Sequence, residues 1–511
     1  MIIATFIAGP YVVGMPENAA AHLSLVPPAV PVPVARSWSI FQRAIFADVA
    51  EGEGHVLVRA RAGTGKTTTI VEALRHLPAG KSALLVAFNK RIAEELQSRA
   101  PAGVQVQTLH AFGFAALRSA FRTRLDNDKA PRIARSLFTE TQLRGGVLGN
   151  LCKLVSRAKA TLAETDDDLD ALIDDMSLDV PEKDRGDFID RAGAILAACS
   201  RDTSTCDFDD MIWLPVRHGV RVPTFDHVFI DETQDLNACQ IELALRAVRK
   251  TGRVFAVGDD RQAIYGFRGA DAQAVDRIVE RLGARVLPLS ITYRCGKAIV
   301  DLARVIVPDY EAAPTAPAGL VREVTEAAIR ADAEPGDFVI SRKNAPLIGL
   351  CLGYIAAGKP ATIAGRDVGA GILALVDRAR AATIVELVTF VDAWAREETD
   401  RLAARGRDTQ PIEDRADCIT ALCEGAADVP EVRARITALF SDTDDSRRIV
   451  CTTVHKAKGL ERERCWVLAS TFSLGSTEED NLWYVAITRA KTELCVSGVR
   501  AAPHVRRSRS S

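Results

Sequence analysis

The sequence lacks the cysteine patterns that hold metals or clusters. Its eleven cysteines are scattered, the closest pair is Cys418 and Cys423, and no CxxC pair or histidine cluster occurs. Structural zinc and iron–sulfur sites need paired thiolates at such short spacings, so these classes are excluded. We expect reduced, mostly buried thiols in a cytoplasmic protein.

A dominant charge, abundant aromatics and a long apolar run are also missing. The chain has 65 basic and 67 acidic residues, a formal charge of −2, and only 6% aromatic residues. This balance neither requires nor excludes nucleic acid, because a basic groove can lie on a neutral protein. The apolar start MIIATFIAGPYVVGM lacks a basic segment and is too short to cross a bilayer. We therefore expect neither a secretory signal nor a membrane partner.

The two ends have the composition of poorly ordered chain. Prolines at 27, 28, 31 and 33 predict an extended leader over 1–36, with Met15 as an alternative start. The segment 500–511 is small, polar and basic, which predicts a disordered tail.

Between the ends, short apolar runs alternate with helical patterns, which predicts α/β units with parallel sheets. One set of runs is HVLVRA (55–60), ALLVAF (83–88), HVFID (227–231) and VFAVGD (254–259). A second set is RVLPLS (285–290), DFVISR (337–342), IVCTTV (449–454) and CWVLAS (465–470). We predict a first α/β domain over 37–114 and 206–283 with a helical insertion at 115–205. A second domain would cover 284–369 and 446–499, with a shorter helical insertion at 370–445.

The segment ARAGTGKTT (60–68) follows a predicted strand and precedes a predicted helix. Backbone N–H groups in such a loop can surround a β-phosphate, aided by the positive end of the helix. Lys66 would reach the β- and γ-phosphates, and the Thr67 hydroxyl would coordinate Mg²⁺. Ala60 occupies the position where the pattern usually has its first glycine. The predicted nucleotide-binding residues here are Ala62, Gly63, Thr64, Gly65, Lys66, Thr67 and Thr68.

A phosphate loop needs an acidic partner on a neighbouring strand, and VFIDETQD (228–235) supplies it. Asp231 and Glu232 follow three apolar residues and so lie at the carboxyl end of a strand. We expect Asp231 to hold Mg²⁺ and Glu232 to orient and deprotonate the attacking water.

The ordered motifs of this chain resemble those of the UvrD/Rep-type superfamily one DNA helicases, from Phe41 to Lys491. The matching segments are FQ (41–42), AFNK (87–90), TLHAFG (108–113), GDDRQAIYGFRGAD (258–271), TYRC (292–295), TVHKAKGLE (453–461) and LWYVAITRAK (482–491). The resemblance implies two RecA-like P-loop domains, each with a helical insertion. It also implies an enzyme that uses ATP and Mg²⁺ to move 3′-to-5′ on single-stranded DNA and to unwind tailed duplex DNA.

The resemblance assigns further roles at the nucleotide. Gln42 would read adenine, Tyr293 would stack on it, and Glu461 would accept a ribose hydroxyl. Gln262 would contact the γ-phosphate and the attacking water. Arg294 and Arg489 would reach the γ-phosphate from the second domain, a task that suits an always-charged fork of donors.

The same comparison predicts a DNA track. Phe267 takes the position where relatives often carry a stacking tryptophan, and a phenylalanine offers a smaller stacking face. The predicted DNA-contacting residues are Phe88, Asn89, Thr108, His110, Tyr265, Phe267, Arg268 and His455.

Two departures from the family pattern leave alternatives open. The interval 370–445 is much shorter than the accessory insertion of full-length relatives, and no nuclease-like cluster of acids follows the last motif. One alternative is an ATPase that strips or remodels protein–DNA complexes without productive unwinding. Another is a nucleotide-regulated switch without DNA. The motifs assign neither protein partners nor a pathway among repair, phage replication and defence.

Overall fold

The computed structural model describes residues 37–176, 178, 180–264, 274–404, 409–441 and 446–497. The predicted leader over 1–36, the tail over 500–511, and Tyr265, Phe267 and Arg268 lie outside these residues.

The first sheet is parallel and has the strand order β3-β2-β6-β7-β1-β8. Its strands are β1 (Val56–Ala60), β2 (Ala83–Ala87), β3 (Val104–Thr108), β6 (Phe225–Ile230), β7 (Val248–Gly258) and β8 (Arg285–Leu289). The strands β6, β7 and β1 are neighbours, so the loops that follow them meet at one edge of the sheet. In open α/β sheets this edge is where ligands bind.

Strand β8 corrects the predicted domain boundary. The sequence predicts that the run RVLPL belongs to the second domain, but it pairs in parallel with β1, from Val56 opposite Arg285 to Ala60 opposite Leu289. That assignment was wrong because β8 is an edge strand, partly exposed and containing Pro288, and its sequence carries no sign of which sheet it joins. We call the residues up to Leu289 the first half and those from Ser290 the second half.

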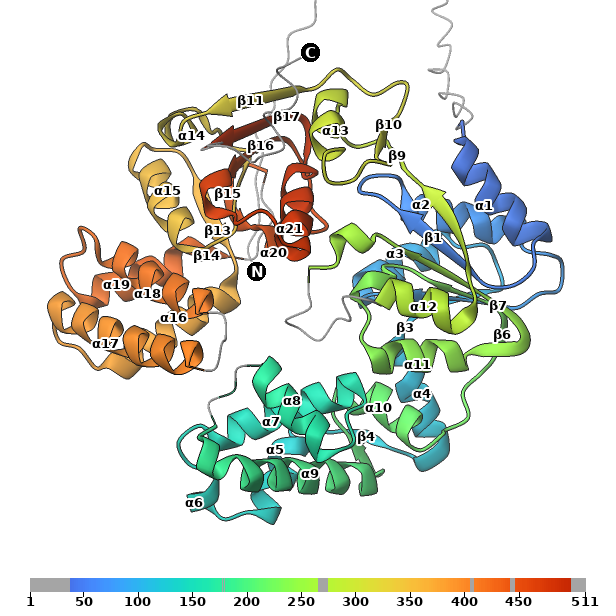
Figure 1. Ribbon diagram of the computed structural model, residues 1–511, viewed down its shortest axis with the longest axis horizontal. Coiled ribbons are helices and arrows are strands. Elements are labelled where there is room, and N and C mark those ends of the chain that lie inside the picture. Colours follow the sequence, from blue (N-terminus) through green and yellow to red (C-terminus); the bar gives the residue numbers. More distant parts are fainter. Residues whose placement is uncertain are drawn as a thin grey trace, which may run out of the picture. The chain divides into compact units, whose positions relative to one another are not determined.

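The helices of the first sheet include α1 (Ile40–Glu51), α2 (Lys66–Ala73), α3 (Lys90–Arg99), α4 (Leu109–Phe121), α10 (Asp210–Arg217), α11 (Ala238–Arg246) and α12 (Ala274–Leu282) (Figure 1). Helix α1 begins with a capping box, in which Ser39 and Gln42 satisfy each other's backbone N–H groups. This cap fixes Gln42 at the start of the helix.

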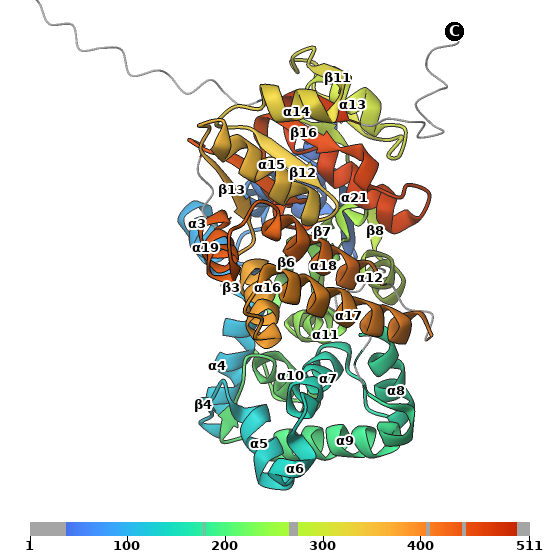
Figure 2. The ribbon, with the colours of Figure 1, turned by 90° about the vertical axis from the view of Figure 1, so that its left-hand side faces the viewer.

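The predicted helical insertion at 115–205 is confirmed as helical. It contains α5 (Lys129–Leu137), α6 (Glu140–Leu143), α7 (Val147–Thr161), α8 (Asp166–Asp175) and α9 (Arg185–Arg201), which form one group in Figures 1 and 2. A short ladder of β4 (Arg124–Leu125) and β5 (Thr205–Cys206) closes its base. Buried ion pairs of Lys129 and Lys159 with Asp210, at 2.7 and 2.8 Å, join the insertion to α10.

The second sheet is also parallel, with the order β11-β17-β16-β12-β15-β13-β14. Its strands are β11 (Leu320–Val324), β12 (Phe338–Ser341), β13 (Ala361–Ala364), β14 (Phe440–Ser441), β15 (Ile449–Thr453), β16 (Arg462–Leu468) and β17 (Ala490–Ser497). The helices outside its insertion include α13 (Lys297–Ala303), α14 (Glu326–Asp332), α15 (Ala345–Ala356), α20 (Val454–Ala457) and α21 (Thr477–Ile487). A short ladder of β9 (Ile291–Thr292) and β10 (Glu311–Ala312) precedes them.

The second insertion at 370–445 is helical as predicted. Its helices are α16 (Arg366–Ala379), which begins before residue 370, α17 (Ile384–Ala403), α18 (Gln410–Cys423) and α19 (Val429–Leu439), and they gather into one orange group in Figure 2. Their apolar faces join a single core with β13 and β15 of the second sheet.

Two general predictions can be compared with this fold. All eleven cysteines are free and all but Cys152 are buried, as expected. Among the described residues, no helix combines the length and the apolar character that a membrane crossing needs.

Candidate nucleotide site and nucleic-acid groove

The phosphate loop has the strand–loop–helix context that its sequence predicted. Strand β1 ends at Ala60 and helix α2 begins at Lys66, with Gly63 (φ 68°) and Gly65 (φ 77°) in left-handed conformation between them. A Cβ atom on Gly63 would lie 2.4 Å from Cβ of Arg294. The loop therefore needs glycine at 63 both for its backbone and for the approach of the second half.

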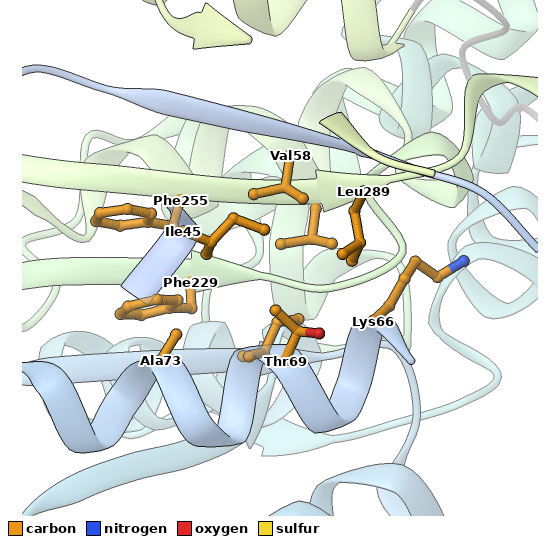
Figure 3. Close-up of a pocket in the computed structure, with 10 residues that line it drawn as sticks. Ile45, Val58, Lys66, Thr69, Ala73, Phe229, Phe255 and Leu289 are labelled. Atoms are coloured by element: carbon orange, nitrogen blue, oxygen red, sulfur yellow. The ribbon is translucent and has the colours of Figure 1, made fainter. Parts of the chain in front are cut away.

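Helix α2 rests on an apolar support. Figure 3 shows the side chains of this support between α2 and the strands, with Lys66 at the start of the helix and its amino group directed away from them. The labelled apolar members are Ile45, Val58, Ala73, Phe229, Phe255 and Leu289. This packing holds the first turn of α2, and with it Lys66, against the edge of the sheet.

The remaining loop residues differ in what they can offer a phosphate. The Ala62 N–H donates to Tyr484 Oη (2.8 Å), so in this structure it is not directed at a phosphate. Thr64 is fully buried, and its hydroxyl donates to the Arg61 carbonyl (2.9 Å). Thr68 lies on α2, where Arg99 donates to its hydroxyl (3.5 Å).

The predicted acidic pair lies beside the loop. Lys66 Nζ is 3.1 Å from Glu232 Oε2, and the Thr67 hydroxyl donates to Asp231 Oδ2 at 3.4 Å. Glu232 has a φ of 50°, a left-handed conformation that is costly for a residue with a side chain. Strain of this kind persists where surrounding contacts enforce it, as they do at many functional sites.

The two carboxyls titrate in opposite directions. Burial and the neighbouring Glu232 raise the pKa of Asp231 to about 7. Burial opposes ionisation of Glu232, but the ammonium of Lys66 and the amide of Gln234 prevail and hold its pKa at about 2. The negative charge of Asp231 is poorly compensated by its neighbours, and the Thr67 hydroxyl lies beside it. Carboxylate and hydroxyl oxygens are ligands that suit Mg²⁺. Asp231 and Thr67 therefore fit the predicted metal role.

Gln262 lies at the same edge, after β7. Its side-chain amide donates to Asp259 Oδ2 (2.6 Å), and the Asp259 N–H donates to Gln234 Oε1 (3.0 Å). From the second half, Lys458 Nζ donates to the Gln262 carbonyl (2.7 Å) and pairs with Asp235 (2.6 Å). The loop after β7 is thus held from both halves.

Arg294 and Arg489 lie in turns of the second half, rather than within the strands or helices themselves. Arg294 pairs with Glu461 at 2.5 Å. Arg489 is fully buried, and it donates to the carbonyls of Val485 (2.9 Å) and Leu460 (3.1 Å). Burial and the neighbouring Arg294 lower the pKa of Arg489 to about 10. The charges of Arg294 and Arg489 therefore repel each other, and an anion bound nearby would relieve that repulsion.

The predicted adenine residues are brought together. Gln42 is buried, its amide donates to Thr69 Oγ1 (3.0 Å), and Tyr293 Oη donates to Gln42 Oε1 (3.4 Å). Tyr293 is half exposed, at 50%, so its ring is open to a base. Glu461 is partly exposed and is held in ion pairs with Arg294 and with Lys491 (3.0 Å).

A separate groove of about 830 Å³ brings together four of the predicted DNA residues of the first half. Its lining includes Phe88, Asn89, Thr108 and His110. The side-chain oxygens of Asn89 and Thr108 cap α3 and α4, so these two residues also shape the groove. His455 lies on α20 of the second half and is not part of this lining.

Phe208 contributes an aromatic face to this groove. It is 57% exposed, and its ring stacks on His110 with centroids 3.8 Å apart. Burial lowers the pKa of His110 to about 4, so the imidazole is neutral at pH 7. Phe88 is also exposed, and the groove therefore offers aromatic surface of the kind on which bases stack.

Two family models match the chain. The model of the UvrD/REP helicase N-terminal domain covers residues 42–282, and that of the UvrD-like helicase C-terminal domain covers residues 431–501. The chain belongs to the UvrD/Rep helicase family. Both α/β halves are consistent with the two RecA-like domains expected of such a helicase.

Several curated helicases are similar to this UvrD/Rep family member. ATP-dependent DNA helicase Rep of Escherichia coli K12 is 27% identical over 283 residues, 50% of this chain and 41% of Rep. DNA helicase II of the same organism is 26% identical over 295 residues, 51% of this chain and 39% of that protein. F-box DNA helicase protein 1 of Schizosaccharomyces pombe is 26% identical over 278 residues, 50% of this chain and 31% of that protein. Each match spans less than half of the relative.

Sequence reasoning missed several residues of this helicase-family site. Lys458 and Tyr484 stand inside the motifs TVHKAKGLE and LWYVAITRAK, so their positions were available although their contacts were not. The sequence around Phe208 contains no recognisable motif. Tyr310 donates to the carbonyl of Ala62 (2.9 Å) from a loop whose sequence carries no signal at all.

Proposed function

We propose that this UvrD/Rep family member is an ATP-driven DNA motor that moves 3′-to-5′ on single strands and unwinds tailed duplexes. One observation carries the proposal: Arg294 of the second half closely approaches Gly63 in the phosphate loop of the first half, where Lys66 pairs with Glu232. The direction of movement rests on the motif resemblance. The eleven free thiols suit a reducing compartment, and we propose the cytoplasm.

Each first-half residue has a role that its surroundings support. Lys66 would bind β- and γ-phosphate oxygens, and the backbone at Gly63 and Gly65 would surround the phosphates. Thr67 and Asp231 would hold Mg²⁺, which supplies positive charge to phosphate oxygens when bound. Glu232, ionised at neutral pH, would accept the proton of the attacking water, and Gln262 would orient that water.

The second half would complete the site. Arg294 and Arg489 are the cations that would stabilise charge on the transferred phosphoryl group, while Tyr293 and Gln42 would bind the base. Because these residues come from both halves, the site is complete only when the halves meet. Opening and closing of the halves would turn hydrolysis into movement along DNA.

The groove of the first half would hold the strand. Phe88 and Phe208 offer stacking faces, and neutral His110 supports the ring of Phe208. By resemblance alone, the track would continue over Tyr265, Phe267, Arg268 and His455.

The decisive experiment is a steady-state ATPase measurement with and without oligo-dT, followed by unwinding of duplexes with 3′ or 5′ tails. We expect strong stimulation by oligo-dT and unwinding only from the 3′ tail. An ATPase indifferent to DNA would contradict the motor and favour a nucleotide switch. Unwinding from the 5′ tail alone would contradict the direction.

The short second insertion supports a second candidate, removal of proteins from single strands without productive unwinding. Helices α16–α19 form most of the described part of this insertion, which leaves little structure for binding duplex DNA. Displacement of streptavidin from a biotinylated oligonucleotide, with no separation of a tailed duplex, would favour this candidate.

A further inference from the structure

The peptide backbone of Ala62 is held on both sides by buried tyrosines. Tyr484 Oη accepts from the Ala62 N–H (2.8 Å), and Tyr310 Oη donates to the Ala62 carbonyl (2.9 Å). Both tyrosines are fully buried, and their rings meet edge to face with centroids 5.7 Å apart. One residue of the phosphate loop is therefore bonded at both of its backbone polar groups.

Both tyrosines belong to the second half. Tyr484 lies on α21, and Tyr310 lies in the loop between α13 and β10. The methyl group of Ala62 also packs into the core cluster of the second half. Ala62 thus follows a strand of the first sheet in sequence but is packed as part of the second half.

Arg61, the residue before Ala62, is also bonded to the second half, in its case through an ion pair. Arg61 is buried and pairs with Asp259 (3.4 Å) and Asp260 (2.5 Å) of its own half. It also pairs with Asp309 of the second half at 3.0 Å, and Asp309 is half exposed. Removal of Asp309 would therefore cut the link to the second half while leaving Arg61 compensated.

The elements that hold the loop are also those that carry the two predicted phosphate arginines. The Tyr293 N–H donates to the Gly63 carbonyl (2.9 Å), and Arg294 is the next residue. Arg489 donates to the carbonyl of Val485, which follows Tyr484 on α21. A displacement of these elements would shift the loop and the arginines together.

We propose that the phosphate loop is positioned from the second half, with Tyr310 acting through Ala62 and Asp309 acting through Arg61 as positioning residues. This inference rests on the proposed ATPase function. If the proposal is right, the geometry of the nucleotide site depends on the position of the second half even before Arg294 or Arg489 contacts a phosphate.

The first test is Tyr310→Phe, which removes one hydroxyl and keeps the packing. Loss of one buried hydrogen bond to the loop should lower kcat/KM for ATP about three- to tenfold. Tyr354→Phe is the matched control, because Tyr354 is equally buried in the second half and donates to the Ile329 carbonyl at the same 2.9 Å. We expect both variants to lose a similar few degrees in Tm, whereas the control keeps its kcat/KM within about twofold. Oligo-dT binding without nucleotide should be unchanged in both.

The second test is Asp309→Asn against Asp301→Asn, the same change at an exposed position on α13. Because Asp309→Asn removes a half-exposed ion pair, we expect it to lower kcat/KM for ATP two- to about fivefold at low salt. This fall should vanish at high salt, where exposed charges are screened. Asp309→Glu should restore activity, and Asp301→Asn should match the parent.

These outcomes separate the two proposals. A parent protein without DNA-stimulated ATPase would overturn the proposed function. A fully active parent whose Tyr310→Phe and Asp309→Asn variants equal their controls would overturn only the positioning of the loop.

Discussion

Replacement of Lys458 by methionine would test how much a buried ion pair between the two halves stabilises the protein. Lys458 Nζ lies 2.6 Å from Asp235 Oδ1, with side chains only 8% and 6% exposed. It also donates to the carbonyl of Gln262 (2.7 Å). Methionine keeps the volume and removes the charge, so Asp235 would remain buried without its partner.

The expected cost is large. Removal of one partner from a buried ion pair destabilises proteins by about 3–5 kcal/mol, whereas replacement of both by neutral residues costs far less. Burial already raises the pKa of Asp235 to about 6 against the attraction of Lys458. Without that attraction its pKa should rise further, leaving the carboxyl largely protonated at pH 7. We therefore expect Lys458→Met to be much less stable than the parent, and Lys458→Met/Asp235→Asn to recover most of the loss.

The pH dependence follows from the sign of this shift. A carboxyl whose folded pKa exceeds its unfolded value of about 3.9 favours folding below that value, and this contribution is lost as pH rises through the folded pKa. The deficit of Lys458→Met relative to the parent should thus be smaller at pH 5 than at pH 8. Thermal unfolding of the three proteins at both pH values is the assay, with DNA-stimulated ATPase measured alongside. Equal stability of the single and double variants would refute a buried, charged pair.

Other consequences of the site can be measured directly. Lys66→Ala should weaken nucleotide binding, whereas Glu232→Gln should bind ATP and fail to turn it over; parental turnover by Glu232→Gln would remove it as the base. His110→Gln should leave the pH profile of oligo-dT affinity unchanged between about pH 5 and 8, because His110, with its pKa at about 4, stays neutral throughout. A rise in parental affinity below pH 6.5 that the variant lacks would speak against this. Phe208→Ala should weaken oligo-dT binding by roughly 1–3 kcal/mol, while Phe121→Ala, an exposed aromatic outside the groove, should not.

The residues predicted from sequence are those whose roles depend on a local pattern. The turn of the phosphate loop requires Gly63 and Gly65, and a buried strand before Asp231 brings the acid to the same edge. Parallel strands align their carboxyl ends, so contact between Lys66 and Glu232 followed from topology that the apolar runs already indicated. Such residues can be found from sequence because a few neighbours determine their conformation.

Residues that act across the two halves could not be predicted in this way. Asp309 and Tyr310 touch Arg61 and Ala62 across more than 240 positions of chain, and nothing near Tyr310 in sequence marks it as a partner of the loop. Strand β8 shows the same difficulty, since it pairs with β1 although its own apolar pattern does not indicate that partner. Long-range partners follow only from the assembled fold.

Paired charges at the candidate site suggest how nucleotide binding and catalysis are ordered. In this structure Lys66 neutralises Glu232, and this ammonium holds the pKa of Glu232 at about 2 despite its burial. A carboxylate with so low a pKa is a poor base, because base catalysis works best when the pKa lies near the ambient pH. When Lys66 turns to phosphate oxygens, Glu232 loses that stabilisation, and its affinity for a proton must rise. We therefore expect Glu232 to become an effective base only once Lys66 is engaged by phosphate, which would suppress hydrolysis until the nucleotide is fully seated.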